Sequence, residues 1–171
     1  MCKNQKKQRE TIQSAKQGTG TSMQIAIPRE THPGENRVPI IPDIAKKLVK
    51  MGAELVIESG MGLGSGYQDS HYTDVGATVS TDRVAMLGAA DAVLRLRKPE
   101  LAEVSQLKPG CIHISYLDPF NEHELVRAFQ NSGITSISME MIPRTTRSQK
   151  MDALSSQASL AGYVMVLLAA M

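Results

Sequence analysis

The strongest constraint on the fold is an alternation, from Met23 onward, between short runs rich in β-branched residues and segments whose apolar residues have helical spacing. Parallel strands need long crossover connections, which are usually helices. The strand–helix–strand order therefore predicts an α/β fold in which helices flank a parallel sheet. The predicted strands are residues 23–28, 54–59, 92–97, 111–115 and 135–140.

Two connecting segments have clear helix boundaries. Residues 42–52 open with a proline and stop at a glycine, which is the usual asymmetry of helix termini. Residues 121–133 are predicted to begin with Asn121 as the N-cap and to end at Gly133. The side chains expected to pack on the sheet are Ile44, Leu48, Val49 and Met51 in the first helix and Leu125, Val126 and Phe129 in the second.

Charge is unevenly distributed between a short leader and the rest of the chain. Residues 1–22 hold five basic residues and one acid, which leaves 14 of the 19 basic and 16 of the 17 acidic residues elsewhere, a net charge of −2. A body with this charge excludes a basic nucleic-acid surface. Residues 1–22 lack an apolar run, so we expect a disordered basic tail that is neither a secretory signal nor a transit peptide.

The cysteines and histidines form no familiar metal or disulfide pattern. Cys2 lies in the tail and Cys111 lies in an apolar run, which favours a reducing compartment. The four histidines lack the short pairings of zinc sites, so we expect no metal site. They are His32, His71, His113 and His123.

The segment from Ala153 to Met171 contains no charged residue, so a membrane span is one interpretation. Its uninterrupted apolar part begins only at Leu160, which is short for a span of about 20 residues. We therefore expect the start of a long interdomain helix that is buried and is cut short by the chain end. The chain would then be the front part of a longer protein, with residues 23–152 as its N-terminal α/β domain.

A glycine-rich stretch, ESGMGLGSGYQD, follows the second predicted strand. A dinucleotide-binding fingerprint needs glycines in the order G-x-G-x-x-G. From Gly60 the third position falls on Ser65, and from Gly62 it falls on Tyr67. We expect a flexible connection here, and no phosphate-binding loop.

Polar residues follow the other strands, where parallel sheets bind ligands. Each group also has a plain interpretation: Glu35 and Arg37 as a surface ion pair, Arg95 and Arg97 as outward residues of an edge strand, and Asp118 as part of an ordinary turn. The groups are Arg29, Glu30, Glu35 and Arg37 after the first strand, Arg97 and Lys98 after the third, and Tyr116 and Asp118 after the fourth.

The stretch PRTTRSQKMDALSSQ, residues 143–157, is denser in directional hydrogen-bonding groups than these. Arg144 is a forked donor, Gln149 both donates and accepts, and Asp152 accepts. A nicotinamide carboxamide requires one acceptor for its NH₂ group and one donor for its oxygen. These residue types at close spacing could supply both.

Three stretches carry a family resemblance: QIAIPRETHPGENRVPIIPD, ELVIESGMGLGSGYQD and PRTTRSQKMDALSSQASLAGY. They resemble the N-terminal domain of the alanine dehydrogenase and proton-translocating nicotinamide nucleotide transhydrogenase superfamily, and the last is typical of the transhydrogenase branch. The resemblance implies a Rossmann-like or flavodoxin-like domain that stops before the dinucleotide-binding domain. It also implies the NAD(H)-binding component of the alpha subunit.

The resemblance assigns roles to the residues of the 143–157 loop. Arg144 would lie beside the nicotinamide and pyrophosphate of NAD(H), and Gln149 would place the ring against NADP(H) on the partner subunit. Asp152 and Ser155 would hold the carboxamide, with Ser156 also at the coenzyme. Gln149 and Asp152 are the residues expected to matter for catalysis, which would be positional because hydride passes directly between two rings.

The resemblance also implies partners: the beta subunit with its NADP-binding domain, a membrane domain, and a second copy of the NAD-binding component. The chain would be cytoplasmic and peripheral on the inner membrane. Two alternatives stay open, an amino-acid oxidoreductase of the alanine dehydrogenase type and a truncated, non-catalytic assembly piece. Alanine dehydrogenases share Arg37, which holds their substrate carboxylate, but have lysine at the position of Arg97 and histidine at that of Asp118.

Overall fold

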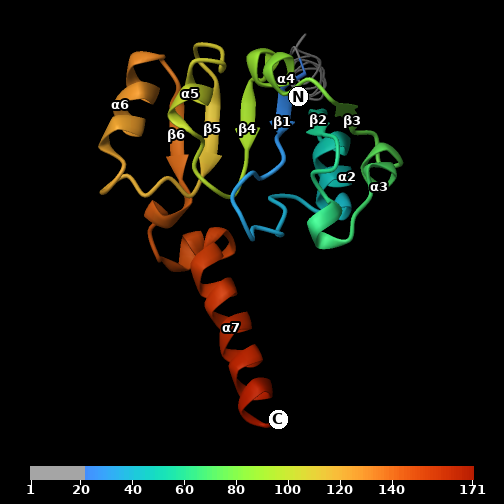
Figure 1. Cartoon of the computed structure of the whole chain (residues 1–171), viewed down its shortest axis with the longest axis vertical. Helices are drawn as coiled ribbons and strands as arrows, with labels where there is room; N and C mark the ends of the chain where they lie inside the picture. Colours follow the sequence, from blue (N-terminus) through green and yellow to red (C-terminus); the bar gives the residue numbers. More distant parts are fainter. Residues whose placement is uncertain (1–21) are drawn as a thin grey trace, which may run out of the picture.

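The computed structural model describes residues 22–171 and contains one sheet of six parallel strands (Figure 1). The predicted tail, apart from Ser22, lies outside the described residues. The parallel α/β architecture is confirmed. The strands are β1 (Gln24–Ile27), β2 (Glu54–Glu58), β3 (Thr78–Ser80), β4 (Ala92–Leu94), β5 (Ile112–Ser115) and β6 (Thr135–Ser138).

The strand order is β3-β2-β1-β4-β5-β6, so the direction of winding reverses between β1 and β4. This is the order of the doubly wound dinucleotide-binding folds, and it differs from that of flavodoxin. Ligands of such sheets bind beyond the carboxyl ends of the strands at the reversal point. The loops that leave β1 and β4 are therefore the first place to look for a site.

Five helices cover the two faces of the sheet. On one face α2 (Pro42–Lys50) and α3 (Asp69–Thr73) bury Ala45 and Tyr72 against Ile27 and Ile57. On the other face lie α4 (Arg83–Ala89), α5 (Leu101–Val104) and α6 (His123–Asn131). Their inward side chains complete a second core cluster with the sheet, formed by Met86, Leu87, Val104, Leu125, Phe129 and Val93.

The prediction of five strands was wrong by one. β3 is only three residues long and lies at the sheet edge, where a short run can pair without a long apolar pattern. The third predicted strand is also shorter than expected. β4 ends at Leu94 because Glu30 takes the backbone N–H groups of Leu96 and Arg97 out of the ladder.

The helix faces were predicted in part. Leu125 and Phe129 are buried as expected, but Met51 is 82% exposed and Ile44 is also exposed. The N-cap of α6 is Glu122 and not Asn121, whose side-chain NH₂ group donates to the Asp118 carboxylate.

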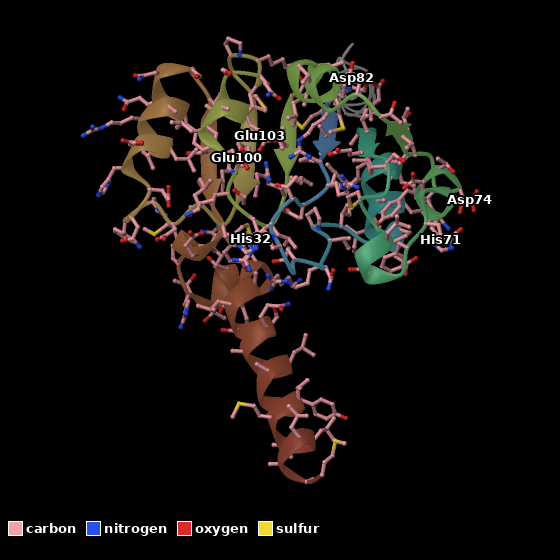
Figure 2. The ribbon with its side chains drawn as sticks, in the orientation of Figure 1. His32, His71, Asp74, Asp82, Glu100 and Glu103 are labelled. Atoms are coloured by element: carbon pink, nitrogen blue, oxygen red, sulfur yellow. The ribbon has the colours of Figure 1, made fainter. Side chains whose placement is uncertain are left out.

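Three 3₁₀ segments lead into and out of the edge that will concern the site: η1 (Leu63–Ser65), η2 (Met139–Met141) and η3 (Thr146–Met151). The last helix, α7 (Ala153–Ala169), points away from the carboxyl edge of the sheet, and Figure 2 shows its side chains projecting around it. From Leu154 onward every residue of α7 is exposed, and burial of this helix within a longer protein stays a prediction. In residues 22–171 no helix combines the length and the apolar character that a membrane crossing requires.

Candidate functional site

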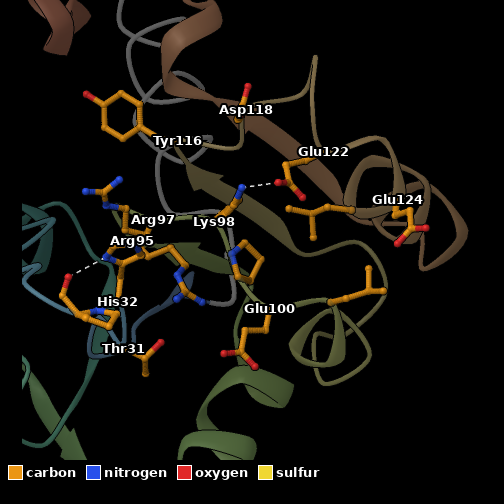
Figure 3. A pocket seen from close by; sticks show the side chains of 14 residues that line it. Thr31, His32, Arg95, Arg97, Lys98, Glu100, Tyr116, Asp118, Glu122 and Glu124 are labelled. Carbon is orange, nitrogen blue, oxygen red and sulfur yellow. Dashed lines mark hydrogen bonds and ion pairs between the residues drawn. The ribbon is translucent and has the colours of Figure 1, made fainter.

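Two clefts open at the carboxyl edge of the sheet, where the winding reverses. The larger, of about 650 Å³, lies between the loops after β1, β4 and β5 and the start of α6. In Figure 3 Lys98 and Glu122 point toward each other and form an ion pair, with Tyr116 and Asp118 beside them. All three cationic residues of this cleft already have carboxylate partners: Arg95 with Glu103, Arg97 with Glu35, and Lys98 with Glu122.

The smaller cleft, of about 400 Å³, lies between the sheet domain and the start of α7. Arg37 from the β1–α2 loop and Tyr67 from the glycine loop line one side. Ala153 and Gln157 of α7 line the other. Tyr116 lines both clefts, so the two hollows meet at this residue.

Glu35 is the charge centre of this edge. Its side chain is only 3% exposed, whereas Arg37 and Arg97 are about half exposed. Arg37 donates to it from Nε at 2.7 Å and from Nη2 at 2.6 Å, and Arg97 donates from Nε at 2.9 Å. Hydrogen bonds from Arg37 first, and from Arg97, lower the pKa of Glu35 to about 2 although burial opposes this. The group is therefore not the exposed ion pair that the sequence allowed.

A chain of alternating charges supports the loops from behind the clefts. Arg95 donates to Glu103 at 2.9 Å and lies 3.8 Å from Glu30, and Arg83 bridges Glu103 and Glu58. Arg95 is 3% exposed and follows β4, which lies between β1 and β5. The interpretation of Arg95 as an outward residue on an edge strand is therefore wrong.

Asp118 has a left-handed backbone conformation, with φ of 51°. The cause lies in η2, where the carboxylate of Glu140 accepts the backbone N–H groups of both Leu117 and Asp118. The Asp118 carboxylate in turn accepts the side-chain amide of Asn121 at 2.9 and 3.0 Å. Hydrogen bonds thus fix the turn at Asp118, and its carboxylate lines the larger cleft.

Asp152 and Ser155 of the 143–157 loop lie together at the start of α7. Asp152 is the N-cap, and its carboxylate accepts the Ser155 N–H at 2.9 Å and the Ser155 hydroxyl at 2.6 Å. These bonds, and the nearby positive charge of Arg144, lower the pKa of Asp152. The carboxylate is therefore held ionised and oriented beside the smaller cleft.

The other predicted residues of the loop are less closely grouped. Gln149 and Arg144 are exposed, and the Ser156 hydroxyl donates to the carbonyl of Ala153 within α7. None of Arg144, Gln149, Asp152, Ser155 and Ser156 lines either cleft, although Ala153 and Gln157, next to them in sequence, line the smaller one.

The glycine loop is a packed turn and not the flexible connection expected. Gly60 and Ser59 bond the carboxylate of Asp69 at 2.8 Å, and Gly62 accepts the N–H of Tyr67 at 3.0 Å. A Cβ at Gly62 would lie 2.6 Å from the Tyr67 carbonyl oxygen. This glycine is therefore required by close approach of the backbone.

Sequence reasoning missed two residues that shape the edge. Glu140 was placed at the end of a strand and given no role, although its position at a carboxyl end was a usable signal. Gln157 is 120 residues from Arg37 in sequence, so no local sequence pattern could predict their contact. Within residues 22–171 no three His, Cys, Asp or Glu side chains gather in a way that would hold a metal ion. Cys111 is buried as a free thiol.

Known proteins share both the sequence and the fold. Residues 26–161 match the family described as alanine dehydrogenase/PNT, N-terminal domain. The NAD(P) transhydrogenase subunit alpha of Cereibacter sphaeroides is 43% identical over 141 residues, which are 82% of this chain and 27% of that protein. The first piece of the divided NAD(P) transhydrogenase subunit alpha of Rhodospirillum rubrum is 40% identical over 146 residues, 82% of this chain and 38% of that one. The chain thus spans well under half the length of these relatives.

Solved structures agree. The transhydrogenase from Sinorhizobium meliloti superposes with a TM-score of 0.81 at 41% identity, covering 86% of this chain and 44% of that one. An L-alanine dehydrogenase superposes with a TM-score of 0.69 at 28% identity, covering 74% and 35%. The chain therefore belongs to the alanine dehydrogenase/PNT N-terminal domain family, and it is more similar to these transhydrogenases than to this alanine dehydrogenase.

Proposed function

We propose that the chain is part of the NAD(H)-side component of a proton-translocating NAD(P) transhydrogenase, and that its 143–157 loop positions nicotinamide for hydride transfer. The single observation that carries the proposal is the Asp152–Ser155 pair. It presents an ionised acceptor and a hydroxyl at the first turn of a helix, beside the cleft at the reversal point of the sheet. Membership of the family supports the class of coenzyme.

The residues present fit a carboxamide. Each Asp152 oxygen accepts one hydrogen bond from Ser155, which leaves further lone pairs for an NH₂ group. The exposed Gln149 amide offers a donor for the carboxamide oxygen, and Arg144 adds positive charge nearby for a phosphate. Bound NAD(H) would supply the hydride chemistry, while these side chains would bind and orient it. Gln149 and Asp152 thus act by position, and Ser156 adds a hydroxyl on the next residue of α7.

The coenzyme NADP(H) and the proton pathway would lie on partners: the beta subunit with its NADP-binding domain, and a membrane domain. The NAD-binding component would form a homodimer in the cytoplasm and sit on the inner membrane through these partners. The relatives are named as subunit alpha, which supports assembly with further subunits.

An amino-acid oxidoreductase is a weaker candidate, because the charges that would bind a carboxylate substrate are already engaged. Both Arg37 and Arg97 bond Glu35. The Asp118 carboxylate stands where the alanine dehydrogenases resembling this chain carry histidine, and it would repel a second carboxylate. A non-catalytic assembly piece is the remaining alternative, which an activity measurement separates from the first.

The test uses the complete subunit assembled with its NADP-binding partner and follows reduction of an acetylpyridine analogue of NAD by NADPH. We expect Gln149→Asn and Asp152→Ala to slow the reaction by roughly tenfold or more, because small displacements of reacting groups cost that much. Arg127→Ala, an exposed change on α6, is the matched control and should keep the parent rate. Parent rates in both loop variants would reject the assignment of the site.

A further inference from the structure

We propose that Arg37 is a positioning residue, which fixes the first turns of α7, and with them Asp152 and Ser155, relative to the sheet. The inference rests on the proposed function for its catalytic consequence, although its geometric part does not. It assigns Arg37 a task other than binding a substrate carboxylate.

Arg37 is held rigidly on one side. Its Nε and Nη2 both donate to Glu35, and its own backbone N–H bonds the same carboxylate at 3.2 Å. Glu35 cannot turn away, because it is buried and also accepts from Arg97 at the end of β4. A guanidinium is planar, so fixing one edge fixes the direction of its remaining nitrogen.

The remaining guanidinium nitrogen of Arg37 contacts α7. Arg37 Nη1 donates to the side-chain oxygen of Gln157 at 3.5 Å. Gln157 lies five residues after Asp152, little more than one turn along the same helix. A contact at this point restrains the first turns of α7, which carry the Asp152 N-cap next to the smaller cleft that Arg37 and Gln157 both line.

The loop that carries Arg37 packs against the glycine loop, which supports it. Ser65 donates from its hydroxyl to the carbonyl of Asn36 at 2.6 Å, one residue before Arg37. A Cβ on Gly64 would lie 3.0 Å from the Asn36 Cα, so any other residue there would push the two loops apart by a few tenths of an ångström. The glycine loop therefore acts as a support for the Arg37 loop, which gives it a role without phosphate.

Few other contacts can fix the orientation of α7 relative to the sheet. After its first turn α7 is exposed along its length, and among the helices and strands of residues 22–171 its main neighbour is η2. A helix attached through a short 3₁₀ segment can swing, and its N-terminal residues swing with it. The Arg37–Gln157 contact opposes that motion at the point nearest the proposed nicotinamide groups.

The structural test measures the distance between two spin labels, one at Ser159→Cys on α7 and one at Lys46→Cys on α2, in the 171-residue chain with Cys2→Ser. Cys111 is buried and stays unlabelled. We expect Arg37→Met and Gln157→Leu each to broaden the distance distribution, and the double variant to broaden it no further. Arg37→Lys should fail to restore the parent width, because an ammonium cannot bond Glu35 and Gln157 in the same fixed directions.

Arg127→Ala is the control and should keep the parent distance distribution. An unchanged distribution in the Arg37 and Gln157 variants would overturn the proposal.

The kinetic test uses the same variants in the assembled enzyme. A positioning role predicts that kcat for hydride transfer falls by about tenfold while the KM for NADH stays near the parent value. A raised KM with unchanged kcat would show that Arg37 binds the coenzyme directly, which overturns the proposal. If the parent enzyme transfers no hydride, the proposed function fails, and the label distances still decide whether Arg37 orients α7.

Discussion

His113 is a buried base in the middle of the sheet, on β5. It is 1% exposed, its ring lies 5.0 Å from that of Phe129, and its Nδ1 lies 3.5 Å from the Ser115 hydroxyl. Burial, with a smaller contribution from the positive charge of Arg95, lowers the pKa of His113 to about 3, although Glu103 opposes the shift. The folded protein therefore holds a neutral imidazole at pH values well below the usual pKa of histidine.

The resulting pH dependence has a definite sign. The unfolded chain binds a proton at His113 below its usual pKa of about 6.5, and the folded chain does not, so the free energy of unfolding should fall as the pH drops from 6.5. The expected loss is about 1 kcal/mol between pH 6.5 and 5.5, measured by urea unfolding. His113→Leu should flatten this dependence. An equally steep dependence in that variant would assign it to other groups.

Glu35 acts in a separate pH window. Its pKa in the folded protein is about 2, below the usual value of 4.5, so its stabilising contribution is complete above 4.5 and is lost only as the pH falls toward 2. Measurements between pH 5.5 and 7.5 therefore report on His113 without interference from Glu35.

At the scale of elements, the glycine loop between β2 and α3 is fixed by shape. A methyl group at Gly62 would meet the Tyr67 carbonyl oxygen at 2.6 Å and the Tyr72 ring at 2.9 Å. Tyr72 is fully buried, and its hydroxyl donates to the Ile40 carbonyl at 2.9 Å, so neither neighbour can move freely. The glycine loop is therefore held in a single conformation by the fixed positions of Tyr67 and Tyr72.

We expect Gly62→Ala to destabilise the chain by about 1–3 kcal/mol, the usual cost of overpacking a filled core. Gly88→Ala in α4 is the matched control. A Cβ there meets its neighbour at an ordinary 3.5 Å, and alanine is the better helix former, so stability should stay equal or rise by up to about 1 kcal/mol. Chemical denaturation of both variants makes the comparison. Equal stability of the Gly62 and Gly88 variants would show that the loop adapts.

The sequence predicted elements well where the pattern was local. β1, β2, β5 and β6 were found because β-branched residues stand between turn signals, and α2 and α6 because proline or polar residues precede their apolar stripes. β3 was not predicted because a strand of three residues, Thr78–Ser80, is too short to show an alternating pattern. Ile44 and Met51 were expected to be buried and are exposed: Met51 lies just past the end of α2 at Lys50, and Ala45 is the buried residue of this helix.

The candidate site was predictable only in part, because sequence patterns report on local structure and not on contacts between distant residues. The strand-end residues Glu35, Arg37 and Arg97 were found because topology places all carboxyl ends on one edge. Their mutual contacts were not, because Glu35 and Arg97 are 62 residues apart and Arg37 and Gln157 are 120 apart. Arg95 is paired with Glu103, which lies on α5, and lies near Glu30, which follows β1, so its partners come from separate parts of the chain.

At the scale of the whole molecule, the described chain contains one sheet domain and one projecting helix. No G-x-G-x-x-G sequence occurs in its 171 residues, and all three cations of the larger cleft are paired with carboxylates. Under the proposed function, the adenosine contacts and the pyrophosphate contacts other than that of Arg144 are therefore expected from outside this domain, as the greater length of the relatives allows.

We expect calorimetric titration of the 171-residue chain with NADH to show weak or undetectable binding. The complete subunit, titrated under the same conditions, is the positive control. Micromolar affinity of the 171-residue chain would contradict this expectation and would show that the sheet domain recognises the whole dinucleotide.

Tyr116 lines both clefts in a chain that contains no tryptophan and only four tyrosines. Its ultraviolet emission is therefore not masked by a brighter indole. An occupant of either hollow would change the surroundings of this phenol ring, so the protein carries an intrinsic optical probe, and Tyr116→Phe would identify its share of the signal.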